Sequence, residues 1–158
     1  MDQRRSKINY YLDIADAAQA RSTCLRRRYG AIIVRDDEIV ATGYNGAPRG
    51  RKNCTDLGCC TRAQMNVPAG ERYELCRSVH AEANAIISAS RKDMLGGTLY
   101  LAGRTAATGE LNPDTTPCAM CRRLIINAGI KKVICRISED EYTVTDVQDW
   151  IDHDDTLG

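Results

Sequence analysis

The sequence predicts an α/β protein, a three-layer α/β/α sandwich around a mixed five-stranded sheet. Three observations lead to this prediction. Two β-branched runs near the N-terminus have the pattern of a hairpin, helix and strand patterns alternate after them, and 158 residues suit one domain with a single core. Hydrophobic residues make up 43% of the chain and charged residues 27%, which is typical of a globular protein. We therefore expect one domain over residues 1–158.

The first part of the chain predicts a helix and a hairpin, followed by a long connection. Residues 6–21 carry apolar side chains at helical spacing, which predicts an amphipathic helix. The runs "YGAIIVR" (29–35) and "EIVATGY" (38–44) flank an Asp-Asp pair and predict two paired strands. Residues 45–77 are rich in Gly, Pro, Cys and Arg, and long connections inside compact domains are commonly functional.

A second helix and a third strand are expected next. Ser78 is a suitable N-cap for a helix that runs from Val79 to about Arg91. The run "GTLYLA" (97–102) predicts a strand because of its apolar and aromatic content. The polar stretch that follows, at 103–115, predicts a loop.

The last part of the chain predicts a helix, two strands and a short terminal helix. Thr116 is a suitable cap, the proline after it suits the first helical position, and Gly129 is a typical C-terminal stop. "KKVICRI" (131–137) and "YTVTDV" predict two strands, and Asp146 is placed to cap the terminal helix.

Two of these helices begin with residues that bind metals. His80 opens one of them, and Cys118 and Cys121 open another. Residues three apart share a helix face, so both thiols point to one place, and the positive end of a helix favours the thiolate. One imidazole and two thiolates leave the fourth zinc position to water, which is the arrangement of catalytic sites. We predict that these three residues bind a catalytic Zn²⁺.

Glu82 is predicted to be the catalytic acid–base group. It lies too far along the helix to bind the metal beside His80, but it is placed to hydrogen-bond the water, whose pKa zinc lowers toward ~7. A His-x-Glu motif alone is typical of a helix surface, and a Cys-x-x-Cys motif alone is typical of zinc or of redox chemistry. The two motifs together, each at a helix start, favour a hydrolytic zinc site.

Charge and cysteine content narrow the expected partners. The net charge of +1 argues against a nucleic-acid-binding protein, although a few arginines still suit a small anion. No run approaches the ~18 apolar residues of a membrane helix and the N-terminus has no apolar signal segment, so we expect a cytoplasmic protein. In a reducing cytoplasm, eight cysteines indicate metal binding or chemistry more than disulfides.

Several short motifs carry a resemblance to a known family. These are "HAEANAI" (80–86), "PCAMC" (117–121) and "INAGIKKV" (126–133), and H-x-E followed by P-C-x-x-C is the pattern of zinc deaminases. The chain thereby resembles the cytidine deaminase superfamily. "GAIIV" followed by "GYNGAPRG" (43–50) makes it similar to the deoxycytidylate deaminase branch, which includes late-competence and phage enzymes.

The resemblance implies a cytidine-deaminase-like fold, and the hydrolysis of dCMP to dUMP and ammonia. His80, Cys118 and Cys121 match the zinc ligands of the family. Glu82 matches the proton shuttle, which protonates N3 of the cytosine ring when C4 is attacked. Asn45 matches the asparagine that holds the sugar hydroxyl.

A nucleotide phosphate needs cationic partners. Arg91 lies where phage-type members carry an arginine linked to phosphate recognition, and Arg26 belongs to the basic run "CLRRR" near the expected mouth of the site. We expect both to bind substrate. The resemblance also implies a homo-oligomer, a hexamer or a dimer, with dCTP and dTTP as effectors that act through the "GYNG" region.

The remaining cysteines suggest a second, structural zinc. Cys24 and Cys54 match positions that help to bind such a zinc in phage members, whose other ligands include histidines that this chain lacks. Cys60 and Cys76 are expected to complete an all-cysteine site. Cys59 is the alternative to Cys60, and free or partly paired thiols are the rival interpretation.

Two segments are interpreted as insertions in a single deaminase domain, the cysteine-rich loop at 45–77 and the stretch at 103–115. The second departs from the family pattern, and a lid and an oligomer contact are the two roles considered for it. Another cytosine nucleoside or nucleotide, or adenosine in tRNA, is an alternative substrate. A non-catalytic zinc-stabilised nucleotide-binding protein is the alternative outside the enzymes.

Overall fold

The protein is built on one mixed five-stranded sheet, as a computed structural model of residues 3–153 shows. The strands lie in the order β2-β1-β3-β4-β5. Their bounds are β1 (Arg27–Arg35), β2 (Glu38–Tyr44), β3 (Thr98–Thr105), β4 (Lys132–Arg136) and β5 (Tyr142–Asp146). Only β3 and β4 pair in parallel, and the other neighbours are antiparallel. The predicted mixed sheet is therefore confirmed.

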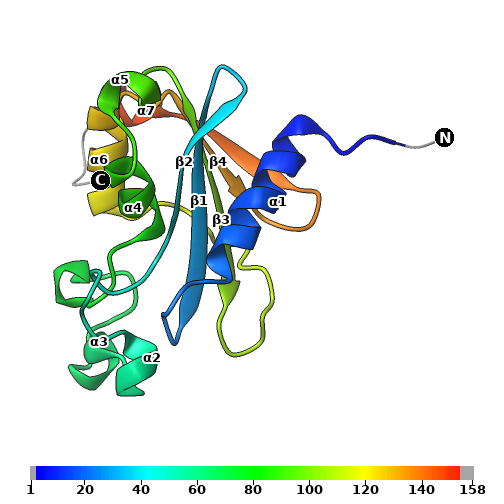
Figure 1. Cartoon of the computed structure of the whole chain (residues 1–158). Coiled ribbons are helices and arrows are strands. Elements are labelled where there is room, and N and C mark those ends of the chain that lie inside the picture. The colour runs from blue at the N-terminus through cyan, green and yellow to red at the C-terminus, as the bar shows by residue number, and fades with distance from the viewer. Residues whose placement is uncertain (1–2, 154–158) are drawn as a thin grey trace.

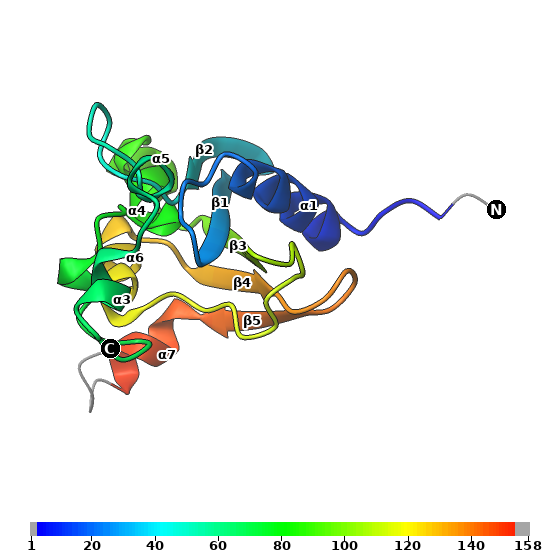
Figure 2. The same ribbon diagram turned by 90° about the horizontal axis from the view of Figure 1, so that it is seen from below.

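Helices cover both faces of this sheet (Figures 1 and 2). Helix α1 (Lys7–Gln19) lies alone on one face, while α4 (Ala81–Ile87), α5 (Arg91–Met94), α6 (Ala119–Ala128) and α7 (Val147–Asp152) lie on the other. Successive strand residues point to opposite faces. Ile32 and Val34 of β1 thus pack beneath α1, while Ala31 and Ile33 join the core beneath α4 and α6. The expected three-layer sandwich is confirmed.

Local turn and cap chemistry behaves as the sequence predicts at several points. The hairpin between β1 and β2 turns at Asp36 and Asp37, whose φ angles of 51° and 63° are ones that Asp tolerates better than most residues. Gly129 ends α6 with a φ of 77°, which suits glycine. Asp146 caps α7 by accepting a hydrogen bond from the Gln148 backbone N–H.

Two predicted helix starts are wrong by two residues. Helix α4 begins after His80 and not after Ser78, because Val79 is held in an extended bridge by two backbone hydrogen bonds to Gly46. Helix α6 begins after Cys118 and not after Thr116. The predicted helix over 79–91 also divides in two, since α4 ends at Ile87 and a separate cap at Ser90 starts α5.

The segment at 45–77 contains short helical turns. These are α2 (Cys54–Leu57), α3 (Thr61–Gln64) and the 3-10 turn η1 (Tyr73–Leu75), and they lie beyond the start of α4 (Figure 1). None of the helices between residues 3 and 153 is long and apolar enough to cross a membrane.

The stretch at 103–115 is not a loop throughout, because β3 continues to Thr105. The chain then turns back, and Leu111 forms a bridge with Arg104. Asn112 donates its backbone N–H to the Gly103 carbonyl at 2.8 Å, and its side-chain Nδ2 donates to the Tyr29 hydroxyl at 3.2 Å. The segment is thus fastened to the ends of β1 and β3 that border the site described below.

Candidate active site

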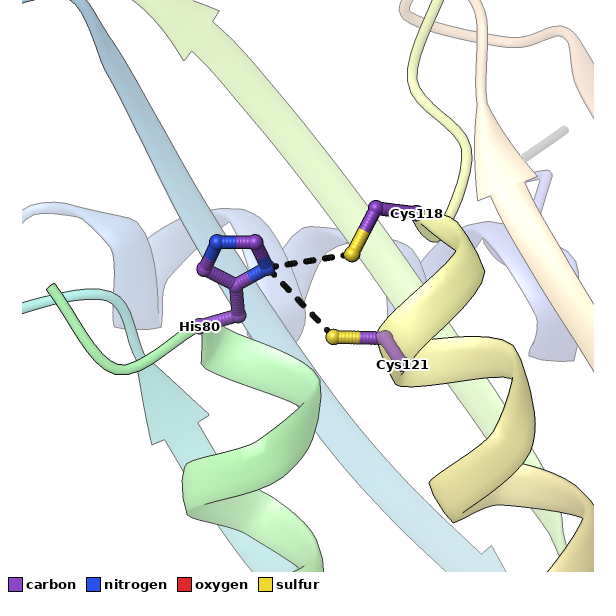
Figure 3. Close-up of side chains that lie close together, drawn as sticks. All are labelled: His80, Cys118 and Cys121. Atoms are coloured by element: carbon purple, nitrogen blue, oxygen red, sulfur yellow. Dashed lines mark hydrogen bonds between the residues drawn. The ribbon is translucent and has the colours of Figure 1, made fainter. Parts of the chain in front are cut away.

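His80, Cys118 and Cys121 converge on one point between α4 and α6 (Figure 3). The Nδ1 atom of His80 lies 3.4 Å from each of the two sulfur atoms. The three ligand atoms lie within 4.8 Å of one another, and within residues 3–153 no other group of three His, Cys, Asp or Glu side chains does so. The convergence that the two motifs predict is confirmed.

Backbone structure at the two helix starts produces this convergence. His80 is the N-cap of α4 and has extended backbone angles, so its imidazole turns toward α6 (Figure 3). Cys118 is the N-cap of α6 and Cys121 lies in its first turn, which places both sulfurs on the same side of the helix. The preceding Pro117 is fully buried and helps to fix the entry of the chain into α6.

The electrostatics of these three residues favour a bound cation. Hydrogen bonds from Cys121 and His80 outweigh burial and lower the pKa of Cys118 to about 4. Cys121 retains the proton, because its pKa is raised by its hydrogen bond to Cys118 and by burial. Burial lowers the pKa of His80, but hydrogen bonds to Cys118 and Cys76 outweigh it and raise the value to about 10.

The donor set therefore fits zinc. A thiolate, a second thiol and an imidazole that attracts positive charge form a site in which Zn²⁺ replaces protons as the cation. Three protein ligands leave one position for a water or a substrate. His80, Cys118 and Cys121 are the residues that would hold the ion.

Glu82 lies beside these ligands and is 4% exposed. Burial raises the pKa of its carboxyl group, and this effect outweighs its backbone hydrogen bond and the nearby His80 charge, which lower it. A carboxyl group with a raised pKa can both accept and release a proton near neutral pH. The placement agrees with the acid–base role predicted for Glu82.

A cavity of about 390 Å³ opens onto the metal-binding residues. Its lining includes His80, Glu82 and Cys118 from the two helix starts, Tyr29 and Leu101 from the sheet, and residues of the cysteine-rich loop. This volume is within the usual range for small-molecule sites.

The structure places two of the three predicted substrate residues at the cavity and the third away from it. Asn45 and Arg26 line the cavity. The side-chain oxygen of Asn45 accepts hydrogen bonds from the Tyr29 backbone N–H at 2.9 Å and from the Ser22 hydroxyl, so its orientation is fixed. Arg91 does not line this cavity, because α4 carries the chain about 10 Å away before α5 begins. Its Nε atom donates to the Asn127 carbonyl at the end of α6.

Arg27, Tyr29 and Arg62 are among the residues that line the cavity and that sequence reasoning did not single out. Arg27 follows Arg26 in the same basic run, so the run itself indicated that arginines line the cavity here. Tyr29 and Arg62 gave no recognisable pattern in the sequence. Tyr29 packs over Gly103, where an added Cβ would lie 2.5 Å from the Tyr29 ring, and only glycine leaves room for it.

The cysteines of the proposed second site also gather near this cavity. Cys24, Cys60 and Cys76 line it, whereas Cys54 is buried and does not line it. Burial raises the pKa of Cys54, and charge repulsion from Cys24, Cys76 and Cys60 raises it further, so the four sulfurs lie near one another. Within residues 3–153, however, no three of these sulfurs lie within 4.8 Å of one another, as the ligand atoms of His80, Cys118 and Cys121 do. All eight cysteines of the chain are free.

Comparison with known proteins identifies the family. The sequence model for the cytidine and deoxycytidylate deaminase zinc-binding region matches residues 5–137. The chain belongs to this family. The match includes both metal-binding motifs and the cysteine-rich loop.

Relatives of this deaminase-family chain include cellular and phage proteins. It is 40% identical over 129 residues to the deoxycytidylate deaminase of Mycobacterium phage D29, covering 79% of this chain and 90% of the phage protein. It is 36% identical over 135 residues to the deoxycytidylate deaminase of Schizosaccharomyces pombe, covering 85% of this chain. The chain spans only 38% of the length of that yeast relative.

A solved structure supports the same family at the level of the fold. The dCMP deaminase of the cyanophage S-TIM5, crystallised with dCMP and dUMP, is 28% identical to this deaminase-family chain. The TM-score is 0.58, and the match covers 85% of this chain and 84% of the cyanophage chain. The cytidine-deaminase-like fold that the sequence motifs implied is thereby confirmed.

Proposed function

We propose that this protein hydrolyses dCMP to dUMP and ammonia. The observation that carries the proposal is the convergence of His80, Cys118 and Cys121 beside the buried Glu82, at the end of a cavity of nucleotide size. The named activities of its relatives support dCMP as the substrate.

The residues of the chain suit each part of this reaction. When bound, Zn²⁺ supplies a Lewis acid that makes water nucleophilic near neutral pH. Glu82 would take one proton from this water and deliver it to N3 of the ring. It would then take the second proton, from the hydroxyl group added at C4, and deliver it to the departing amino group, so that ammonia leaves and a C4 carbonyl remains. Burial of Glu82 keeps bulk water from exchanging that proton. Asn45 is proposed to accept or donate a hydrogen bond at the sugar hydroxyl, and Arg26 to contact the phosphate.

Ammonia release from a panel of substrates tests the proposal. The panel contains dCMP, deoxycytidine, cytidine and a tRNA stem-loop with adenosine, each offered to the zinc-loaded protein. We expect dCMP to have the highest kcat/KM. Faster release from another member of the panel would assign the same chemistry to that substrate. Binding of dCTP without turnover of any cytosine compound would identify a nucleotide-binding protein instead.

We propose a second, structural zinc held by Cys24, Cys54, Cys60 and Cys76. The electrostatic contact of Cys54 with the other three supports it, and such a metal would fasten the cysteine-rich loop to the body of the protein. Metal analysis should find two zinc ions per chain. The Cys60→Ser variant should lose one of them, whereas Cys59→Ser, at the neighbouring thiol, should retain both.

We also propose that the protein forms a homo-oligomer, a hexamer or a dimer, that responds to dCTP and dTTP. A second cavity, of about 500 Å³ and lined by Gly43, Tyr44 and Arg49, supports an effector site at the "GYNG" region. Ile87 on α4 is 73% exposed and Leu124 on α6 is 44% exposed, which supports an interface on these helices. Light scattering and rate measurements with each nucleotide test these points.

We place this activity in the cytoplasm, where a reducing environment keeps the eight free thiols available as metal ligands. A fusion to a fluorescent protein, followed in cells, would show a diffuse cytoplasmic distribution if the proposal holds.

A further inference from the structure

Arg62 is a buried cation in the wall of the active-site cavity. It lies in the short helix α3 of the cysteine-rich loop and is only 6% exposed. No carboxylate among residues 3–153 forms a salt bridge with it, although it lines the cavity. Burial of a charged group is costly unless it is paired or hydrogen-bonded. Hydrogen bonds to neutral groups lower this cost but leave the positive charge of the guanidinium unneutralised, and such a charge suits an anionic ligand that enters the cavity.

Backbone carbonyl groups fix the position of the Arg62 guanidinium. Its Nε and Nη2 atoms donate to the Glu71 carbonyl at 3.2 and 2.7 Å, and Nη2 also donates to the Pro68 carbonyl at 3.1 Å. Nη1 makes no hydrogen bond to the part of the chain that the structure describes. The guanidinium is thus oriented before any ligand binds, and one nitrogen remains available to an acceptor.

An aromatic ring separates this cation from the metal-binding residues. The guanidinium carbon lies 4.4 Å from the centre of the Tyr73 ring, in a cation–π contact. The same ring meets the imidazole of His80 edge-on, with the ring centres 5.1 Å apart and the planes at 85°. In a nucleoside monophosphate the sugar separates the phosphate from the base. When the base reaches the metal-binding residues, the phosphate therefore lies away from them, as the Arg62 guanidinium does.

We propose that Arg62 binds the phosphate of the substrate and makes this site selective for a nucleoside monophosphate over a nucleoside. Tyr73 is its positioning residue, because it holds the guanidinium on one side and packs against His80 on the other. Arg26 and Arg27 also line this cavity and add positive charge to it. The inference rests on the proposed function, since it assumes that the cytosine ring reaches the metal-binding residues.

Binding of two ligands that differ only by a phosphate tests the inference. The dissociation constants of dUMP and deoxyuridine are measured by calorimetry for the zinc-loaded wild type, Arg62→Gln and Arg62→Lys. Arg72→Gln is the matched control, because Arg72 lies in the same loop but is exposed and pairs with Glu74. We expect Arg62→Gln to weaken dUMP binding about 10- to 100-fold, as for loss of a charge-assisted hydrogen bond. Deoxyuridine binding should change less than about twofold, because it contains no phosphate for Arg62 to contact.

The controls separate this role from a purely structural one. If Arg62 only organises the loop, Arg62→Gln will weaken dUMP and deoxyuridine equally, and that result overturns the inference. Unchanged binding of both ligands also overturns it. If Arg62→Gln loses zinc or unfolds, Arg62→Lys answers the question: it keeps the charge without the planar fork, and should weaken dUMP alone, by about tenfold or less.

Failure of the proposed function gives a different result. A wild-type protein that binds dUMP more tightly than deoxyuridine, but releases no ammonia from dCMP, would contradict the proposed reaction and leave the phosphate contact intact. If the wild type releases ammonia from dCMP, and dUMP binding is unchanged in Arg62→Gln, the result would contradict the phosphate contact and leave the proposed reaction intact.

Discussion

Zinc uptake should release two protons per ion at the site formed by His80, Cys118 and Cys121. The perturbation is removal of zinc with a chelator, followed by its return at pH 7. At this pH Cys118 is already a thiolate, because its pKa is about 4. His80, with a pKa of about 10, and Cys121, whose pKa is raised, are both protonated. Zinc requires neutral imidazole and thiolate ligands, so it displaces one proton from each.

This stoichiometry fixes how zinc affinity depends on pH. Protons compete with zinc for His80 and Cys121. Zinc affinity therefore rises with pH over the range in which both groups are protonated in the metal-free protein and Cys118 is ionised. Two released protons correspond to about a hundredfold change in affinity per pH unit, or ~2.7 kcal/mol. The dependence should hold from about pH 5 to about pH 9, between the pKa values of Cys118 and His80.

Titration calorimetry in two buffers of different ionisation enthalpy measures the released protons directly. The control is a variant with His80→Ala, Cys118→Ser and Cys121→Ser together, which loses this site and retains the other cysteines. The difference between wild type and variant should be one zinc ion and about two protons. A difference of no protons would mean that the three ligands are already deprotonated, and would refute the electrostatic reasoning for the site.

Three further substitutions test the site and the fold. Glu82→Gln should lower kcat about 10²- to 10⁴-fold with unchanged zinc content, because it removes the acid–base group and spares the metal ligands, and ammonia release with metal analysis checks this. Leu12→Ala should cost about 2–5 kcal/mol in urea unfolding, since Leu12 of α1 is fully buried against the sheet, whereas the exposed Tyr10→Ala should cost much less. Gly129→Ala should lower the unfolding free energy by about 1 kcal/mol or more, because φ is 77° and the new Cβ would lie 2.4 Å from a Leu95 methyl group.

Local chemistry made most of the fold predictable. Paired Asp residues give a tight hairpin between two β-branched runs, Gly129 terminates a helix, and Asp146 starts one. Each of these features depends on residues within a few positions of one another. Each metal-binding motif is equally local, but their convergence joins helix starts 38 residues apart, and it could be expected because H-x-E followed by P-C-x-x-C is the pattern of zinc deaminases.

Errors arose where distant backbone decides the local conformation. Val79 would continue a helix by its own neighbours, but its two hydrogen bonds to Gly46 hold it extended, so the cap moves to His80. The third strand extends to Thr105 because it pairs with Arg27 at the start of β1. Neither partner is near in sequence, so no local pattern could indicate them.

The placement of the arginines shows why chemistry was easier to predict than substrate contacts. The metal ligands are set by spacing along helices, and a helix has one geometry. Arg62, in contrast, reaches the cavity because its loop folds around it through the carbonyls of Pro68 and Glu71, and because Tyr73 lies between it and His80. No local pattern in residues 59–77 indicates that arrangement, because it depends on contacts that form only when the loop folds. Residues that determine the reaction thus lie at the starts of regular elements, while the residue proposed to determine the substrate lies where only the folded loop can place it.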